Sequence, residues 1–150
     1  FADFARLQAR KVNEGRFRGR AIFFRFVKRP EETGERYGDR RFRPAGVTTV
    51  RARVTDDRDA IFTPCRYTVT AATVLGCPPA SDRATRELDL REIVSFRGRF
   101  SDQARQGEWI VARGSLELVV PGDGSPHHRL VVGGRAGDYL AAVARDADEP

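Results

Sequence analysis

Paired acidic residues raise the first chemical question, because two carboxylates on rigid elements can hold Mg²⁺ against the phosphates of a nucleotide. The sequence has two Asp-x-Asp pairs, Asp57 with Asp59 and Asp146 with Asp148. The first pair lies in a turn between two expected strands, and the second lies in the C-terminal tail. Neither place supplies the rigidity that the chemistry requires. We therefore interpret these acids as turn formers and solvated surface, and we expect no catalytic residue in this chain.

Metal ligands and nucleophiles give no stronger signal. His127 and His128 are adjacent in an expected hairpin loop, without a cysteine or third ligand at metal-binding spacing. Cys65 is expected to be a small core residue on a strand, and Cys77 a thiol in a loop. No combination of Ser, Cys and His has the spacing of a catalytic triad. The sequence thus predicts no metal site and no cofactor.

Binding to a polyanion is the function that the charge distribution favours. The 150 residues carry a net charge of +6 at pH 7. Residues 1–53 hold fifteen basic and six acidic side chains, a net +9, whereas residues 54–150 hold twelve basic and fifteen acidic ones, a net −3. Only Lys11 and Lys28 are lysines, so the basic surface consists almost entirely of guanidinium groups, which suit phosphate. This asymmetry points to nucleic acid, either RNA or single-stranded DNA.

Basic and aromatic residues also alternate along the chain. They do so at Arg16-Phe17-Arg18, Phe24-Arg25-Phe26, Arg40-Arg41-Phe42-Arg43, Arg66-Tyr67 and Phe96-Arg97-Gly98-Arg99. Single strands are held by cations along their backbone and by aromatic faces under their bases. Part of the alternation follows from amphipathic strands, with Phe96 expected in the core. The phenylalanines of 23–27 also suit docking on another domain, so an interdomain or homodimer module without nucleic-acid contact stays open as an alternative.

The elements that must position these residues are mostly short strands. Alternating patterns predict strands at 47–54, 61–70, 93–100, 108–120 and 128–132, with a short helix at 101–106. Val50, Ala52 and Val54 are expected to point inward. Residues 1–13 are expected to form a helix, 21–27 a strand and 28–46 a polar loop; a last helix is expected to start at the cap Asp138. We divide the chain into a basic, aromatic-rich extension and linker at 1–45 and a barrel domain at 46–150.

The fold class is therefore mainly β with flanking helices. Five strands with a helix between the third and fourth match an oligonucleotide-binding (OB-like) barrel, and a small Greek-key sandwich is the alternative. No run of residues has the length and apolarity of a membrane span, and no signal peptide is evident. We expect a soluble protein of the cytoplasm.

Several separated segments resemble one known family in the same order. They are FRGRAIFFRFVKRPEE, RYGDRRFRPAGVTTVRARVTDD, IFTPCRY, EIVSFRGRFSDQARQGE and RLVVGGRAGDY. Together they look like the C-terminal region of archaeal predicted nucleotidyltransferases. The resemblance implies a catalytic core upstream of Phe1, bearing a Gly-Ser pair followed by Asp-x-Asp, an arrangement that this chain does not offer. The absence of methionine also favours a piece of a longer protein.

On such a barrel the ligand usually crosses the outer face of the second and third strands. The alternation places basic residues of the first three strands on that face, next to the basic loop. The residues expected to bind nucleic acid are Arg40, Arg41, Arg43, Arg51, Arg53, Phe62, Arg66, Arg97 and Arg99.

Overall fold

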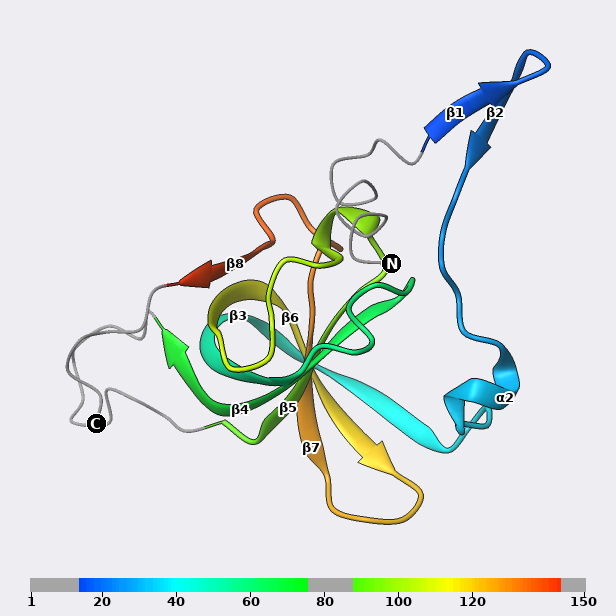
Figure 1. Ribbon diagram of the computed structural model, residues 1–150. Coiled ribbons are helices and arrows are strands. Elements are labelled where there is room, and N and C mark those ends of the chain that lie inside the picture. The colour runs from blue at the N-terminus through cyan, green and yellow to red at the C-terminus, as the bar shows by residue number, and fades with distance from the viewer. Residues whose placement is uncertain (1–13, 76–87, 144–150) are drawn as a thin grey trace.

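The computed structural model describes residues 14–75 and 88–143 (Figure 1). Nearly all of this part is β-structure. The elements are β1 Glu14–Phe17, β2 Arg20–Phe23, a one-turn helix α2 Pro30–Thr33, β3 Arg40–Asp56, β4 Cys65–Leu75, β5 Leu90–Ser95, a 3₁₀ turn Gly98–Phe100, β6 Trp109–Pro121, β7 His127–Val131 and β8 Tyr139–Val143. No helix in this part of the chain is long and apolar enough to cross a membrane.

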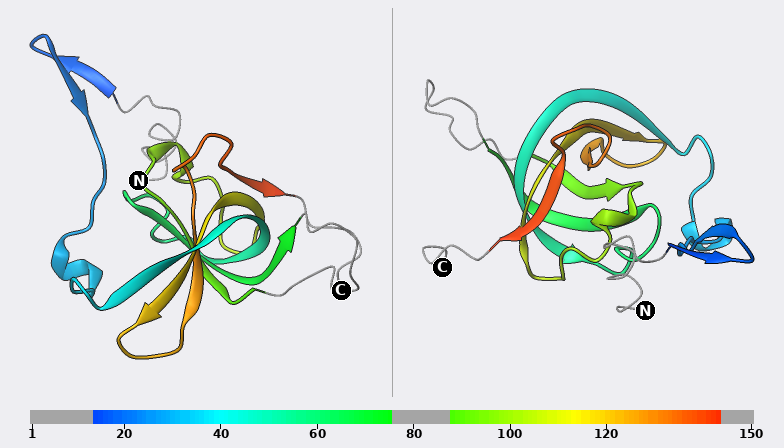
Figure 2. Two further views of the ribbon diagram at one scale, coloured as in Figure 1. Left: turned by 180° about the vertical axis from the view of Figure 1, so that it is seen from behind. Right: turned by 90° about the horizontal axis from the view of Figure 1, so that it is seen from above.

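Five strands close into a barrel, as the alternating patterns predicted. Their order is β3-β4-β5-β7-β6, and β6 returns to pair with β3, so the sheet closes on itself (Figure 2). The pairing of β5 with β7 is parallel, and the other pairings around the ring are antiparallel. β3 reaches around the barrel because it is 17 residues long and its register shifts between Pro44 and Val47. Such bulges increase the bend of a strand.

The barrel interior is filled by the residues that alternation placed inward. Val50 and Ala52 of β3 and Ile110 and Ala112 of β6 are each 0% exposed. Gly114 continues the inward row of β6, and a Cβ there would lie 2.3 Å from the carbonyl oxygen of Val131. Glycine is thus the residue that lets β6 approach β7 at this point.

The prediction of a helix at 101–106 is wrong. A 3₁₀ turn precedes this segment instead. Phe100 is buried, and its carbonyl oxygen accepts a 2.7 Å hydrogen bond from the hydroxyl of Tyr67. The same hydroxyl accepts a bond from the backbone N–H of Gln103. Asp102 has a φ of 55°, which a right-handed helix does not allow. Tertiary contacts of Tyr67 therefore override the local helical signal.

The prediction of a C-terminal helix is also wrong, because Tyr139–Val143 forms β8. This strand pairs with Trp109–Arg113 of β6 and so satisfies the backbone groups of that edge. The Asp138 side chain accepts bonds from the N–H groups of Gly133 and Arg135, at 2.8 and 3.1 Å. It closes the turn before β8 rather than capping a helix.

The N-terminal region differs from expectation in two further ways. The strand expected at 21–27 is shorter and belongs to a β1–β2 hairpin. The loop expected at 28–46 contains α2, and β3 already begins at Arg40, so this strand runs across the expected domain boundary at residue 45. The helix expected at 1–13 lies outside the described residues.

Phe96 is exposed rather than in the core. The expected third strand ends at Ser95, whose buried hydroxyl donates to the carbonyl oxygen of Val132 at 2.7 Å and accepts from the N–H of Arg97. The alternation therefore breaks before Phe96, whose side chain is 56% exposed.

Cys65 supports a chemical test of this core. The residue is 1% exposed, and burial raises the pKa of its thiol to about 11. The other cysteine, Cys77, lies outside the described residues. Since the thiolate is the reactive form, we expect Cys65 in a Cys77→Ser variant to resist iodoacetamide at pH 8 until denaturant is added. Mass spectrometry of the alkylated protein measures this, and rapid labelling of the native protein would contradict the burial.

Candidate functional site

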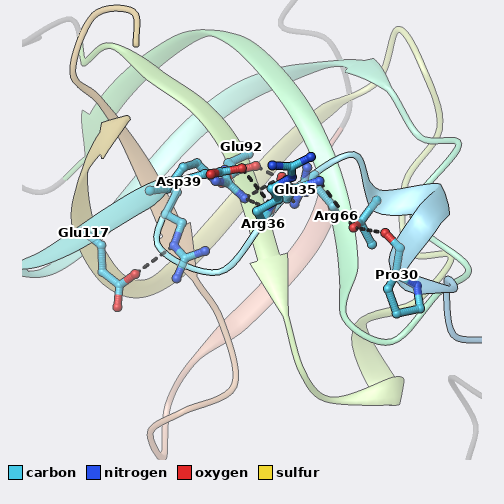
Figure 3. Close-up of polar contacts among 10 residues, drawn as sticks. Pro30, Glu35, Arg36, Asp39, Arg66, Glu92 and Glu117 are labelled. Atoms are coloured by element: carbon cyan, nitrogen blue, oxygen red, sulfur yellow. Dashed lines mark hydrogen bonds and ion pairs between the residues drawn. The ribbon is translucent and has the colours of Figure 1, made fainter. Parts of the chain in front are cut away.

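A buried carboxylate gathers two arginines on the outer face of the barrel. Glu92 of β5 has a side chain that is 8% exposed, and its two oxygens lie 3.1 Å from Arg40 of β3 and 3.2 Å from Arg66 of β4. Glu35, which precedes β3, lies 2.7 Å from Arg40 and 3.4 Å from Arg66 (Figure 3). We call these four residues the Glu92 cluster. Its two guanidinium groups are each shared by two carboxylates.

A stack of rings and guanidinium groups continues from the cluster. The guanidinium of Arg129 in β7 lies 3.5 Å from the ring centroid of Phe42 in β3, and that of Arg40 lies 5.5 Å from it. Arg129 also donates a 2.7 Å hydrogen bond to Glu117 of β6 (Figure 3). Cations over aromatic faces stabilise such an arrangement. The outer face thus carries stacked, charge-paired groups on every barrel strand.

The segment 26–39, which we call the arm, is fixed at this face. The carbonyl oxygen of Phe26 accepts a 2.8 Å hydrogen bond from the N–H of Thr63. The amine of Lys28 lies 2.6 Å from Asp59 and 5.3 Å from the ring centroid of Phe62. With Glu35 in the Glu92 cluster, the arm is attached at three points to β4 and the turn before it.

A cavity of about 200 Å³ lies between the arm and the barrel. Phe62, Val94 and Phe96 give it an apolar and aromatic wall. Lys28, Arg66 and Arg129 add three cations to its lining, and Glu35 and Asp59 add two carboxylates. Aromatic surface beside cationic groups is the combination that holds a base and its phosphate.

The expected binding residues fall into separate groups rather than on one face. Arg40 and Arg66 meet in the Glu92 cluster, and Phe62 lines the cavity beside it. Arg97 and Arg99 are exposed on the turn after β5, where Arg99 lies 4.8 Å from the Phe100 ring centroid.

The remaining four lie along β3. Arg41 and Arg43 are exposed on its first half. On its second half, Arg51 lies 4.3 Å from the ring centroid of Trp109, and Arg53 donates to the carbonyl oxygen of Gly107 at 3.4 Å. These two are engaged with the start of β6, so the structure does not bring them to the cavity.

Sequence reasoning missed several residues of the site, among them Lys28, Glu35, Glu92, Phe96 and Arg129. Glu92 carried a usable signal, since it is the one acid inside the apolar strand Leu90–Ser95, where a carboxylate needs a cationic partner. Arg129 lies within the strand expected at 128–132. The structure starts this strand, β7, at His127, so the two histidines that were expected in a loop belong to it and are half-buried.

The acids of the turn before β4 are occupied by cations. Asp57 lies 3.8 Å from Arg105, and Asp59 pairs with Lys28. Hydrogen bonds from Arg58 hold the pKa of Asp56 below its ordinary value. No three residues among His, Cys, Asp and Glu converge on a metal-binding point within the ranges that the structure describes. The second acidic pair, at 146 and 148, lies outside those ranges.

Comparison with known proteins gives one informative likeness. The chain is 30% identical over 133 residues to an uncharacterized protein of the archaeon Methanocaldococcus jannaschii. The match covers 89% of this chain but only 35% of the relative, so the chain spans about a third of that protein's length. No family model matches the sequence, and no solved structure matches it.

Proposed function

We propose that the barrel binds single-stranded nucleic acid, RNA or DNA, on its outer face and that it is a non-catalytic accessory domain. The strand order supports an OB-like assignment. Numbered along the barrel, the strands run 1-2-3-5-4 and close from 4 to 1, with strands 3 and 5 parallel. This connectivity supports the proposal, because oligonucleotide-binding barrels are Greek-key barrels of five strands.

The observation that carries the proposal is the cavity at β4 and β5, the second and third strands of the barrel. It combines the exposed ring of Phe96 with the cations Lys28 and Arg129, and Arg97 and Arg99 extend the positive surface from the same strand end. A base stacked on Phe96 would place its neighbouring phosphates within reach of these side chains.

A nucleotidyltransferase context is the second element of the proposal. The colinear segments that resemble archaeal predicted nucleotidyltransferases support it. The longer archaeal relative, of which this chain spans about a third, leaves room for such a core. In this proposal the domain presents a nucleic-acid substrate to a catalytic core elsewhere in the longer protein, in the cytoplasm. The chain itself would then show no nucleotidyl transfer.

The Arg97→Ala/Arg99→Ala double variant tests the binding proposal. Each lost phosphate contact lowers the slope of log affinity against log salt by about 0.7 on single strands, so we expect a decrease of about 1.4 for the pair. Fluorescence anisotropy with a mixed-sequence oligonucleotide, repeated over a salt series, measures both affinity and slope.

The matched control is Arg91→Ala/Arg113→Ala. It removes the same charge from two exposed positions, where Arg91 pairs with Asp89 and Arg113 contacts Thr49. This control is expected to keep the parent slope. If the parent chain binds no oligonucleotide, or if both double variants behave alike, the proposal fails.

An interdomain or dimerisation module is the alternative function. The exposure of Phe23, Phe24 and Val27, at 60%, 54% and 66%, favours it, because exposed apolar side chains of this size commonly mark docking surfaces. A parent chain that self-associates in sedimentation experiments and binds no oligonucleotide would support this alternative.

A further inference from the structure

The β1–β2 hairpin stands away from the barrel. An extended segment connects it to α2, and it points outward in each view (Figures 1 and 2). Arg18 and Gly19 form its two-residue turn with φ values of 49° and 77°. Positive φ at both positions is the geometry of tight hairpins. We call Glu14–Phe23 the ribbon. A two-stranded ribbon is marginally stable alone in water, so a partner would stabilise this one.

Uncompensated positive charge is concentrated on the ribbon. No acidic residue occurs from Gly15 to Pro30, whereas Arg16, Arg18 and Arg20 lie within the ribbon itself. All three are exposed, and within the described ranges none of them pairs with a carboxylate. Arg40, Arg66 and Arg129 of the outer barrel face, in contrast, pair with Glu35, Glu92 and Glu117.

The ribbon also presents aromatic rings next to these charges. Phe17 and Phe23 are 61% and 60% exposed. Phe17 is paired opposite Arg20, and the guanidinium of Arg18 lies 5.3 Å from the Phe17 ring centroid. A fitting partner therefore offers anionic groups and apolar edges across the width of two strands. A second copy of the chain would bring the same positive charge and be repelled.

We propose that the ribbon inserts into the major groove of double-stranded DNA. That groove is about 12 Å wide and admits a two-stranded β-ribbon, whereas the deep, narrow major groove of duplex RNA does not. Arg16, Arg18 and Arg20 contact phosphates, while the ring of Phe17 beside the tip reaches the base edges. This surface is separate from the single-strand site on the barrel, so the two proposals stand or fall independently.

The test uses a blunt-ended, mixed-sequence DNA duplex and the full chain. For Arg16→Ala/Arg18→Ala/Arg20→Ala we expect the salt slope to fall by about 2.7, three times the value of 0.9 per phosphate on duplex DNA. The urea unfolding curve of the barrel should not change. Arg18→Gly removes one charge at a φ that suits glycine, so it keeps the hairpin and should lower the slope by about 0.9.

The charge-matched control is Arg58→Ala/Arg91→Ala/Arg113→Ala, which should keep the parent affinity for the duplex. Three results would overturn the proposal: no duplex binding by the parent, equal losses in ribbon and control variants, or an equal loss on single strands and duplex. The last result would identify the ribbon as a general polyanion contact. Loss of single-strand binding alone in Arg97→Ala/Arg99→Ala would concern only the barrel site. Capture of a protein by the ribbon without any duplex binding would likewise contradict insertion of the ribbon into the major groove.

Discussion

The Gly114→Ala substitution is expected to lower the free energy of unfolding by about 3 kcal/mol, at the upper end of the usual cost of overpacking a core. The added methyl carbon would lie 2.3 Å from the backbone oxygen of Val131 and 3.0 Å from its carbonyl carbon. Backbone cannot rotate out of the way as a side chain can, so β6 and β7 must separate locally. Urea denaturation followed by circular dichroism measures the change.

Gly134→Ala is the matched control for this experiment. A methyl carbon added at Gly134 would meet no heavy atom within 4 Å, and the residue has no positive φ, so alanine fits there without strain. We expect its midpoint to stay at the parent value. If both variants unfold at the parent midpoint, the close approach of β6 and β7 is not a feature of the folded barrel.

The Glu92→Ala substitution has the second-largest expected effect. It removes the carboxylate between Arg40 and Arg66 and leaves two partly buried guanidinium groups with Glu35 alone. Removing one partner of a buried ion pair costs about 3 kcal/mol or more, and we expect about 2 kcal/mol here because both arginines keep some contact with solvent. Thermal and urea unfolding of the same samples give the measured value.

Asp89→Ala provides the comparison for Glu92→Ala. Asp89 also pairs with an arginine, Arg91, but both side chains are about half exposed. Solvent screens such a pair, so its loss should leave stability close to that of the parent. Equal effects of the two substitutions would show that the burial of Glu92 does not contribute to the stability of the folded chain.

The barrel could be predicted because its signal is local. Val50, Ala52 and Val54 alternate with polar residues, and a period of two places them on one face whatever their partners are. The predictions fail where contacts with residues distant in the sequence decide the local structure. Tyr139–Val143 is short enough to suit a helix or a strand, and only the free edge of β6 selects the strand. Phe96 was misplaced because the end of β5 depends on Ser95 bonding to Val132.

The site was predictable only in part, for the same reason. Basic residues of the right type were found, yet Arg40 and Arg66 are 26 positions apart and meet only because Glu92 lies between them. Ion pairing between strands that are distant in sequence leaves no mark in the local pattern. Glu35 and Lys28 were missed because the segment that carries them was interpreted as a polar loop, whereas it forms the arm.

Closure of the barrel through β3 and β6 has a kinetic consequence. The paired positions are far apart in the sequence, from Arg53 with Trp109 to Arg40 with Pro121. The entropy of closing such long loops is lost before the hydrogen bonds of the ladder compensate for it, and topologies of high contact order fold slowly. Until that closure, the apolar row of β6 that includes Ile110 and Ala112 stays open to solvent and to neighbouring chains. Raising the protein concentration during refolding should therefore lower the yield of folded protein.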